Sequence, residues 1–414
     1  MASYLRLITR RARRRSPQPP VFRWERLSGH PIKLSARAPM AAAVALAAMV
    51  SVLATGAAPA SAGVRAGAPA QPAFQAAIQQ IVTDGVPGAI GYARNGSQVV
   101  VTASGLADLA TQAPMALGDR VRVGSITKTF VATVVLQLAA EHRLRLSDSV
   151  ARWLPGLVPN GASITLRELL QHTSGIFDYA QDPGFQQALR ADPTRVWRPR
   201  ELVRIAVAHP PVFPPGTSFA YSNTDYILLG LIIQAATGQT VGQQLQDRIF
   251  TPLDLRQTSF PYAKPTLPRP FAQGYLLNQP GATGPADITV ISPSWAWAAG
   301  GIVSTARDIA RFYSALLAGR LLPAPLLREM MTTVPIAPGA GYGLGITAAP
   351  LPCGTVWGHT GNVPGYANNA FTTADGVHQA VVLVNADDGT LGPTLSMQQE
   401  ADIGAALQVG ICGS

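Results

Sequence analysis

A serine and a lysine three residues apart, Ser125 and Lys128, stand in the stretch VGSITKTF (123–130). The chain has 32 basic residues, yet only Lys33, Lys128 and Lys264 are lysines. Arginine stays protonated in proteins, whereas a lysine amine can be held in its neutral, basic form. On a helix the two side chains share a face, so Lys128 could take the proton of an attacking Ser125 hydroxyl. Taken alone, the pattern also fits a helix-capping serine beside a surface lysine.

Two further stretches carry groups that could join this chemistry. FAYSNTDYILLG (219–230) holds Tyr221, whose phenol can relay a proton, and Asn223, whose amide can bind a substrate carbonyl and the lysine. VWGHTGNVPGY (356–366) places His359, Thr360 and Gly361 on a predicted strand, where they could hold an extended substrate. Each stretch has a plainer interpretation by itself: a capping turn with a buried tyrosine, and an ordinary edge-strand histidine.

The surrounding pattern predicts the elements that would position these groups. Asn95-Gly96, between two runs rich in β-formers, predicts a hairpin over 89–105, and apolar spacing predicts a helix over 129–142 that starts just after Ser125. The other predicted elements are a helix over 74–83, a mostly helical stretch over 145–290, strands over 341–346, 354–361, 368–376 and 379–385, and a last helix over 394–409.

These elements predict an α/β (α+β) fold with one antiparallel sheet built from both ends of the chain. Residues 63–130 together with 290–414 would form the sheet and its flanking terminal helices. Residues 131–289 would form an inserted, mainly helical region.

The three motifs, in this order and at these separations, resemble the serine β-lactamase and penicillin-interacting enzyme family with its S-x-x-K, Y-x-N and K/H-T-G elements. The resemblance extends over about residues 75–412 and is strongest to the exported serine D-alanyl-D-alanine carboxypeptidases and the class C β-lactamases. The other stretches that carry it are RVRVGSITKTF, LLQHTSGI, PGTSFAYSNTDY, SWAWAAGGIVST, GYGLG and GHTGNVPGY. It implies the β-lactamase/transpeptidase-like fold.

The resemblance also implies a role for each motif residue. Ser125 would be the acylated nucleophile, Lys128 its base and Tyr221 the proton relay to the leaving group. The implied substrate contacts are the amide of Asn223, His359 at the Lys or His position of the third motif, the Thr360 hydroxyl, the Gly361 backbone, an oxyanion hole of the Ser125 and Asn362 N–H groups, and Trp295 as a cleft wall, with core packing as its alternative. No metal or organic cofactor is implied.

The implied activity is that of a D-alanyl-D-alanine carboxypeptidase (DD-peptidase) acylated by β-lactams. A β-lactamase, an esterase or a D-amino-acid amidase on the same scaffold is the alternative. One position departs from the family pattern, because the arginine that grips the substrate carboxylate in the carboxypeptidases aligns with Thr347. A hydroxyl cannot replace a bidentate charge. A silent β-lactam-sensing protein is disfavoured, since Ser125, Lys128 and Tyr221 are all present. We expect a small peptide or β-lactam substrate and a monomer.

Residues 1–62 have the composition of an export signal. Ten basic residues against Glu25 alone give this segment +9 of the net charge of +10, so the rest of the chain is near neutral and no nucleic-acid surface is indicated. A basic stretch, the apolar run MAAAVALAAMVSVLATG and the ending Ala60-Ser61-Ala62 predict a cleaved signal peptide and a secreted protein without a membrane anchor. A retained anchor is the alternative. In an oxidising compartment Cys353 and Cys412 would pair, with two buried thiols as the alternative.

Overall fold

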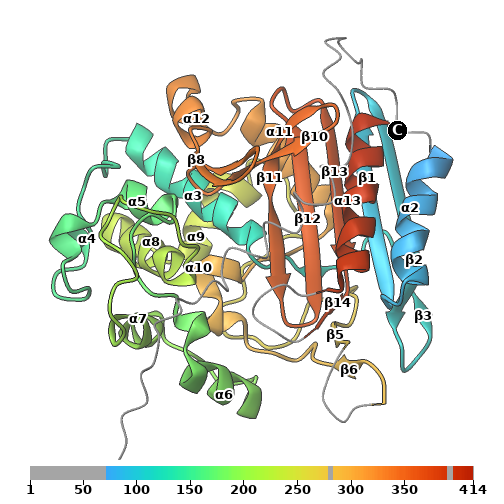
Figure 1. Cartoon of the computed structure of the whole chain (residues 1–414), viewed down its shortest axis with the longest axis horizontal. Helices are drawn as coiled ribbons and strands as arrows, with labels where there is room; N and C mark the ends of the chain where they lie inside the picture. Colours follow the sequence, from blue (N-terminus) through green and yellow to red (C-terminus); the bar gives the residue numbers. More distant parts are fainter. Residues whose placement is uncertain (1–70, 278–282, 389–394, 414) are drawn as a thin grey trace, which may run out of the picture. The chain divides into compact units, whose positions relative to one another are not determined.

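An antiparallel sheet of nine strands organises the part of the chain that the computed structural model describes, residues 71–277, 283–388 and 395–413 (Figure 1). The predicted leader lies outside these residues. The strands of the sheet follow the order β3-β2-β1-β13-β12-β11-β10-β9-β8. Their bounds are β1 Gly88–Asn95, β2 Gln98–Asp108, β3 Ala113–Pro114, β8 Val334–Ala337, β9 Ala340–Tyr342, β10 Thr347–Leu351, β11 Gly354–Val363, β12 Tyr366–Thr373 and β13 His378–Val384. Strands from the two ends of the described chain therefore share one sheet, since β1 pairs with β13.

The two faces of the sheet are covered by different helices. Alternate residues of β13 enter different cores: Val382 and Val384 pack with the helices α2 (Gln71–Thr83) and α13 (Met397–Cys412), whereas Val381 and Leu383 join the larger core on the other face. Since side chains alternate along a strand, the continuous apolar run is what a strand buried on both faces requires. Figure 1 shows α2 (blue) and α13 (red) beside each other over one face.

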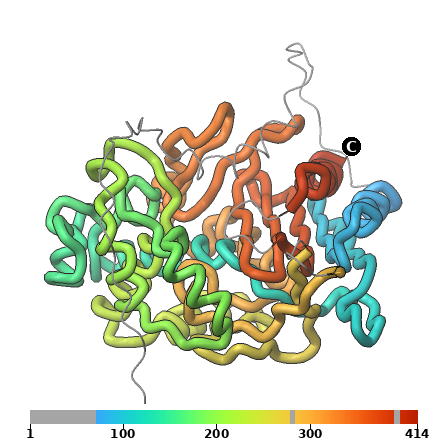
Figure 2. The backbone as a smooth tube through the Cα atoms, turned by 60° about the horizontal axis from the view of Figure 1, so that its bottom comes forward, coloured from blue at the N-terminus to red at the C-terminus, as the bar shows by residue number. Residues whose placement is uncertain are grey.

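The remaining helices lie on the side of the chain that carries the motifs. Their bounds are α3 Ile126–Ala140, α4 Val150–Trp153, α5 Leu166–Leu170, α6 Pro183–Ala191, α7 Pro199–Val207, α8 Asn223–Thr237, α9 Val241–Leu245, α10 Trp297–Gly300, α11 Ala306–Leu317 and α12 Ala324–Met330. Short strands add a pair, β4 Val121–Arg122 with β7 Val303–Ser304, and a small sheet of β5 Tyr275–Leu276, β6 Ala286–Asp287 and β14 Ala386–Asp387. Figure 2 shows the segment coloured green, about residues 150–240, gathered on the side away from α2 and α13.

Two of these helices, α3 and α8, are buried along nearly their whole length. A helix that is apolar all round must lie inside the protein rather than on its surface. The two helices contact each other, and α3 also contacts β11 (Figure 1). Both therefore hold their N-terminal residues in fixed positions beside the sheet. None of the helices that the structure describes has the length and hydrophobicity needed to span a bilayer.

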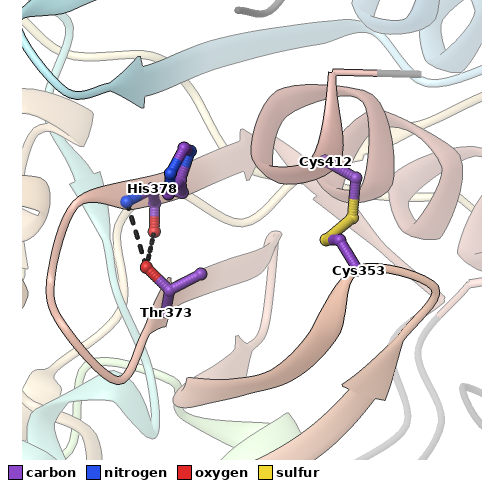
Figure 3. The surroundings of a disulfide bond; sticks show 4 residues. All are labelled: Cys353, Thr373, His378 and Cys412. Carbon is purple, nitrogen blue, oxygen red and sulfur yellow. Dashed lines mark hydrogen bonds between the residues drawn. A yellow bond between two sulfur atoms is a disulfide. The ribbon is translucent and has the colours of Figure 1, made fainter. Parts of the chain in front are cut away.

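A disulfide closes the end of the described chain onto the sheet. Cys353, in the turn between β10 and β11, is bonded to Cys412, the last residue of α13 (Figure 3). The predicted pairing of the two cysteines is confirmed in the structure.

The predicted fold class is confirmed, with two local corrections. The predicted strand over 341–346 is wrong beyond Tyr342, because the amides of Leu344 and Gly345 donate to the carbonyls of Met330 and Leu170 instead of to a neighbouring strand. The last helix begins at Met397, where Ser396 caps it, and runs to Cys412. The division into a sheet-containing and a mainly helical region stays a prediction.

Candidate active site

Ser125 stands at the N-terminus of α3, but its side chain does not cap the helix. Its Oγ lies 2.9 Å from Nζ of Lys128 instead. The helix N-terminus has a partial positive charge, which favours negative charge on groups near it. The bland reading of this motif is therefore wrong on both counts, because the serine is not a capping residue and Lys128 is completely buried.

Lys128 is held by three oxygen atoms from three elements. Besides Ser125 Oγ, its Nζ lies 2.8 Å from Oδ1 of Asn223 on α8 and 2.8 Å from the carbonyl oxygen of Ala299 on α10. Burial lowers the pKa of Lys128 to about 7, although Asp178 and Asp225 nearby oppose the shift. Near neutral pH a substantial fraction of Lys128 is therefore a free amine that can accept a proton.

Tyr221 and Asn223 lie at the N-terminus of α8, as the apolar run after them predicts. Nζ of Lys128 is 4.7 Å from the centre of the Tyr221 ring. Burial raises the pKa of Tyr221 above its ordinary value, while a hydrogen bond with Ser125 lowers it in part. Tyr221 is thus a neutral phenol beside both Ser125 and Lys128, where it can donate a proton and receive one.

The third motif occupies β11, with His359 buried behind its edge. Nδ1 of His359 faces the carbonyl oxygen of Thr360, which can only accept, so Nδ1 carries the hydrogen. Nε2 then accepts a hydrogen bond of 2.9 Å from the hydroxyl of Tyr342. Burial, followed by the charge of Lys128, lowers the pKa of His359 to about 3. His359 is therefore a neutral residue in this site.

Two glycines allow the turn before α3 to touch β11. Gly124 has a φ of +56°, and a Cβ on it would lie 2.8 Å from the amide nitrogen of Asn362. A Cβ on Gly361 would lie 2.0 Å from the carbonyl oxygen of Val123. The backbone that carries Ser125 and the backbone that carries Asn362 are thus packed together without intervening side chains.

Thr347 and Thr360 lie on the same face of the sheet. Thr347 is opposite Gly358, and Thr360 is two residues farther along β11, so the two are diagonal neighbours. Thr347 is only 6% exposed. The position that the resemblance aligns with a carboxylate-binding arginine is therefore filled by a buried, uncharged side chain.

Trp295 is less closely tied to the site than the other predicted residues. It is 6% exposed and belongs to the large hydrophobic core, with its ring centre 6.4 Å from that of Phe185. This placement favours the core-packing alternative, and its contact with a substrate stays a prediction.

Buried polar residues that the sequence did not single out surround the site. They are Asp178, His172, Asp225 and Tyr342. Asp178 accepts a hydrogen bond from Asn223, and Asp225 contacts Nδ1 of His172, whose ring centre is 4.3 Å from that of Tyr221. The only signal for them was their position inside or next to quoted stretches such as LLQHTSGI. Among the described residues, no group of His, Cys, Asp or Glu is arranged to hold a metal ion.

Residues 74–400 match the protein family described as Beta-lactamase. The chain belongs to this family. A penicillin-binding protein 4 of Amycolatopsis lactamdurans is 34% identical over 51% of this chain and 54% of its own length. A D-aminopeptidase of Cereibacter sphaeroides is 28% identical over 73% of this chain and 57% of its own length. The chain thus spans a little over half of the length of the curated relatives it matches.

Solved structures match over more of their length. A D-stereospecific amidohydrolase from Streptomyces is 40% identical, with a TM-score of 0.75, over 84% of this chain and 100% of that one. The D-amino acid amidase from Ochrobactrum anthropi, in complex with L-phenylalanine amide, is 27% identical, with a TM-score of 0.72, over 82% and 97%. These comparisons place the site among those of serine hydrolases with the β-lactamase fold.

Proposed function

We propose that this protein is a serine amidohydrolase that forms an acyl-enzyme on Ser125 and hydrolyses amides of D-amino acids. The observation that carries the proposal is the hydrogen-bonded group of Ser125, Lys128 and Asn223, in which a fully buried lysine with a pKa of about 7 contacts the serine hydroxyl. The names of the two solved relatives, an amidohydrolase and a D-amino acid amidase, support the substrate class.

The reaction follows from where protons can go. Ser125 Oγ attacks the substrate carbonyl carbon as its proton passes to Nζ of Lys128. The resulting oxyanion accepts hydrogen bonds from the N–H groups of Ser125 and Asn362, which the packing of Gly124 against β11 keeps together. The carbon–nitrogen bond then breaks, and the leaving amine takes the proton from Lys128 through the Tyr221 hydroxyl. Water releases the acid by the same route in reverse.

The charges at the substrate end of the site support a neutral leaving group. A D-alanyl-D-alanine peptide ends in a carboxylate, for which a binding site needs a cation. Thr347 is uncharged, and His359 is neutral because burial lowers its pKa to about 3. An amide requires only hydrogen-bond partners, and the Thr347 and Thr360 hydroxyls can supply them.

The DD-peptidase activity that the sequence suggested is the second candidate. The match to a penicillin-binding protein and the His-Thr-Gly motif on β11 support it. On this reading β-lactams would acylate Ser125 as well.

Matched substrates separate the two candidates. The purified protein is incubated with D-phenylalanine amide, L-phenylalanine amide and a peptide ending in D-alanyl-D-alanine, and ammonia and D-alanine are measured. We expect ammonia from the D-amide alone, and none from the Ser125→Ala variant. D-alanine release without amide hydrolysis would instead make the second candidate correct. Intact mass after mixing with benzylpenicillin then tells whether a β-lactam acylates the protein.

We further propose that the protein is exported, on the strength of the leader-like residues 1–62 and the Cys353–Cys412 disulfide. N-terminal sequencing of protein from the culture medium tests this, with residue 63 as the expected first residue. The expected monomer stays a prediction, and a penicillin-binding protein homologue of Pyrococcus abyssi with 26% identity and a TM-score of 0.67 is described as octameric. Gel filtration with light scattering measures the assembly state.

A further inference from the structure

Asp178 is a buried carboxylate that touches the site from behind. It lies between α5 and the short 3-10 helix Tyr179–Gln181, and it is 8% exposed. Its Oδ1 accepts a hydrogen bond of 3.1 Å from the backbone N–H of Ala180. Its Oδ2 accepts one of 2.9 Å from Nδ2 of Asn223. Both oxygens therefore receive hydrogen bonds from donors, and one of these donors belongs to the residue that holds Lys128.

The direction of the Lys128 lone pair depends on Asn223. A neutral amine has two N–H groups and one lone pair, and Nζ of Lys128 has three neighbours at hydrogen-bond distance. Asn223 Oδ1 and the Ala299 carbonyl oxygen can only accept, so they take the two N–H groups. The lone pair is then left for the hydroxyl hydrogen of Ser125. This arrangement is the one that general-base catalysis requires.

The arrangement holds only while Asn223 presents its oxygen to Lys128. If the Asn223 amide turned over, its NH2 group would face Nζ and compete with Ser125 for the lone pair. A carboxylate can only accept hydrogen bonds, so Asp178 bonds to the NH2 end of the amide and repels the oxygen end. We propose that Asp178 is a positioning residue that fixes the orientation of the Asn223 amide and so aims the lone pair of Lys128 at Ser125.

Asp178 also contributes charge at Lys128, together with groups from the other packed elements. Asp225 and Tyr226 face Lys128 from α8, and Tyr221 faces it from the turn before that helix. His172 and His359 face it from the segment after α5 and from β11, and burial lowers the pKa of both. Asp225 is engaged elsewhere, since it bonds Ser174 Oγ and contacts His172. Asp178 is the carboxylate connected to Lys128 through Asn223.

Asp178→Asn tests the proposal with little change in volume. An asparagine has one acceptor and one donor end, whereas both partners of Asp178 are donors. The Asn223 amide is then free to turn over. We expect the acylation rate to fall about 10- to 100-fold, as misdirected reacting groups typically cause. The loss of a negative charge should also lower the pKa of Lys128, so the acid limb of the kcat/KM profile should move down by about one pH unit.

Asp182→Asn is the matched control. Asp182 caps α6 as Asp178 caps the preceding turn, accepting the N–H of Phe185, and it also bonds His209. We expect this variant to lose some stability but to keep the wild-type acylation rate and acid limb. If Asp178→Asn keeps both of these wild-type values, or lowers the rate without moving the acid limb, the positioning role is overturned.

The inference rests on the proposed acyl-enzyme at Ser125, and its failure is distinguishable from failure of that proposal. If the wild-type protein forms no acyl-enzyme with a D-amino-acid ester or amide, the proposed function itself fails. If Asp178→Asn does not fold, Asp178→Ser replaces it, because a serine keeps the cap on the Ala180 amide but does not reach Asn223. The same loss of rate and the same shift of the acid limb are then expected, and their absence overturns the inference.

Discussion

Gly124 is the residue at which the chain allows Ser125 and β11 to meet. Its φ is +56°, and a Cβ here would lie 2.7 Å from the carbonyl carbon of Gly361 and 2.8 Å from the amide nitrogen of Asn362. Both are backbone atoms, so they cannot rotate aside as the end of a side chain can. Gly124→Ala must push β11 away from Ser125 or distort the turn before α3.

The size of the effect can be worked out from these two features. A non-glycine residue in the left-handed region costs about 1–2 kcal/mol. Overpacking against atoms that cannot move away adds about 1–3 kcal/mol. We therefore expect Gly124→Ala to lower the free energy of unfolding by about 2–5 kcal/mol. The N–H groups of Ser125 and Asn362 would also separate, and loss of one oxyanion donor typically lowers kcat about 10²- to 10³-fold.

Gly96→Ala is a control that has the backbone strain without the clash. Gly96 has a φ of +59° in the turn between β1 and β2, and no heavy atom lies within 4 Å of a Cβ placed there. We expect it to lose only about 1–2 kcal/mol of stability and no activity. Urea unfolding followed by tryptophan fluorescence gives the stabilities, and pre-steady-state acylation by a chromogenic D-amino-acid ester gives the rates. An acylation rate for Gly124→Ala within twofold of the Gly96→Ala rate would refute the argument that this close approach builds the oxyanion hole.

Three other perturbations test the site and the scaffold. Because burial lowers the pKa of Lys128 to about 7 and only the free amine accepts a proton, kcat/KM should rise with pH up to about 7 and then level off; a buffer series measures this, and a limb centred near pH 10 would contradict it. Lys128→Arg should lower acylation about 10²- to 10⁴-fold, since the charge stays and the base is lost; burst kinetics at pH 8 measure it, and a wild-type burst would rule out the proton transfer. Cys353→Ser opens a loop with a sequence separation of 59 residues, so chemical unfolding should show a loss of about 4 kcal/mol; Cys412→Ser should match it, and unequal losses would point to a cause other than the crosslink.

Local sequence features predicted the secondary structure well where they controlled it directly. Asn95-Gly96 marks the hairpin because only residues that tolerate a positive φ fit such a turn. The run VVLV of β13 is apolar at every position because the strand is buried on both faces. The stretch GYGLGI misled because its amides could form sheet bonds as well as the bonds to Met330 and Leu170 that they make in the structure. Only the position of those distant carbonyls decides between the two.

The sequence by itself determined the family and the residues of the three motifs, since a serine, a lysine, a tyrosine and a histidine at these spacings are chemical groups that can be read without a fold. The tertiary structure decided their states and their helpers. Lys128 and His359 are shifted toward their neutral forms because water is excluded from them, and burial depends on every segment packed around a residue. Asp178 lies 45 positions before Asn223 in the chain, and only the packing of its turn against α8 brings its carboxylate to that amide. Hydrogen bonds and desolvation act over a few ångströms in space, and distance along the sequence does not measure them.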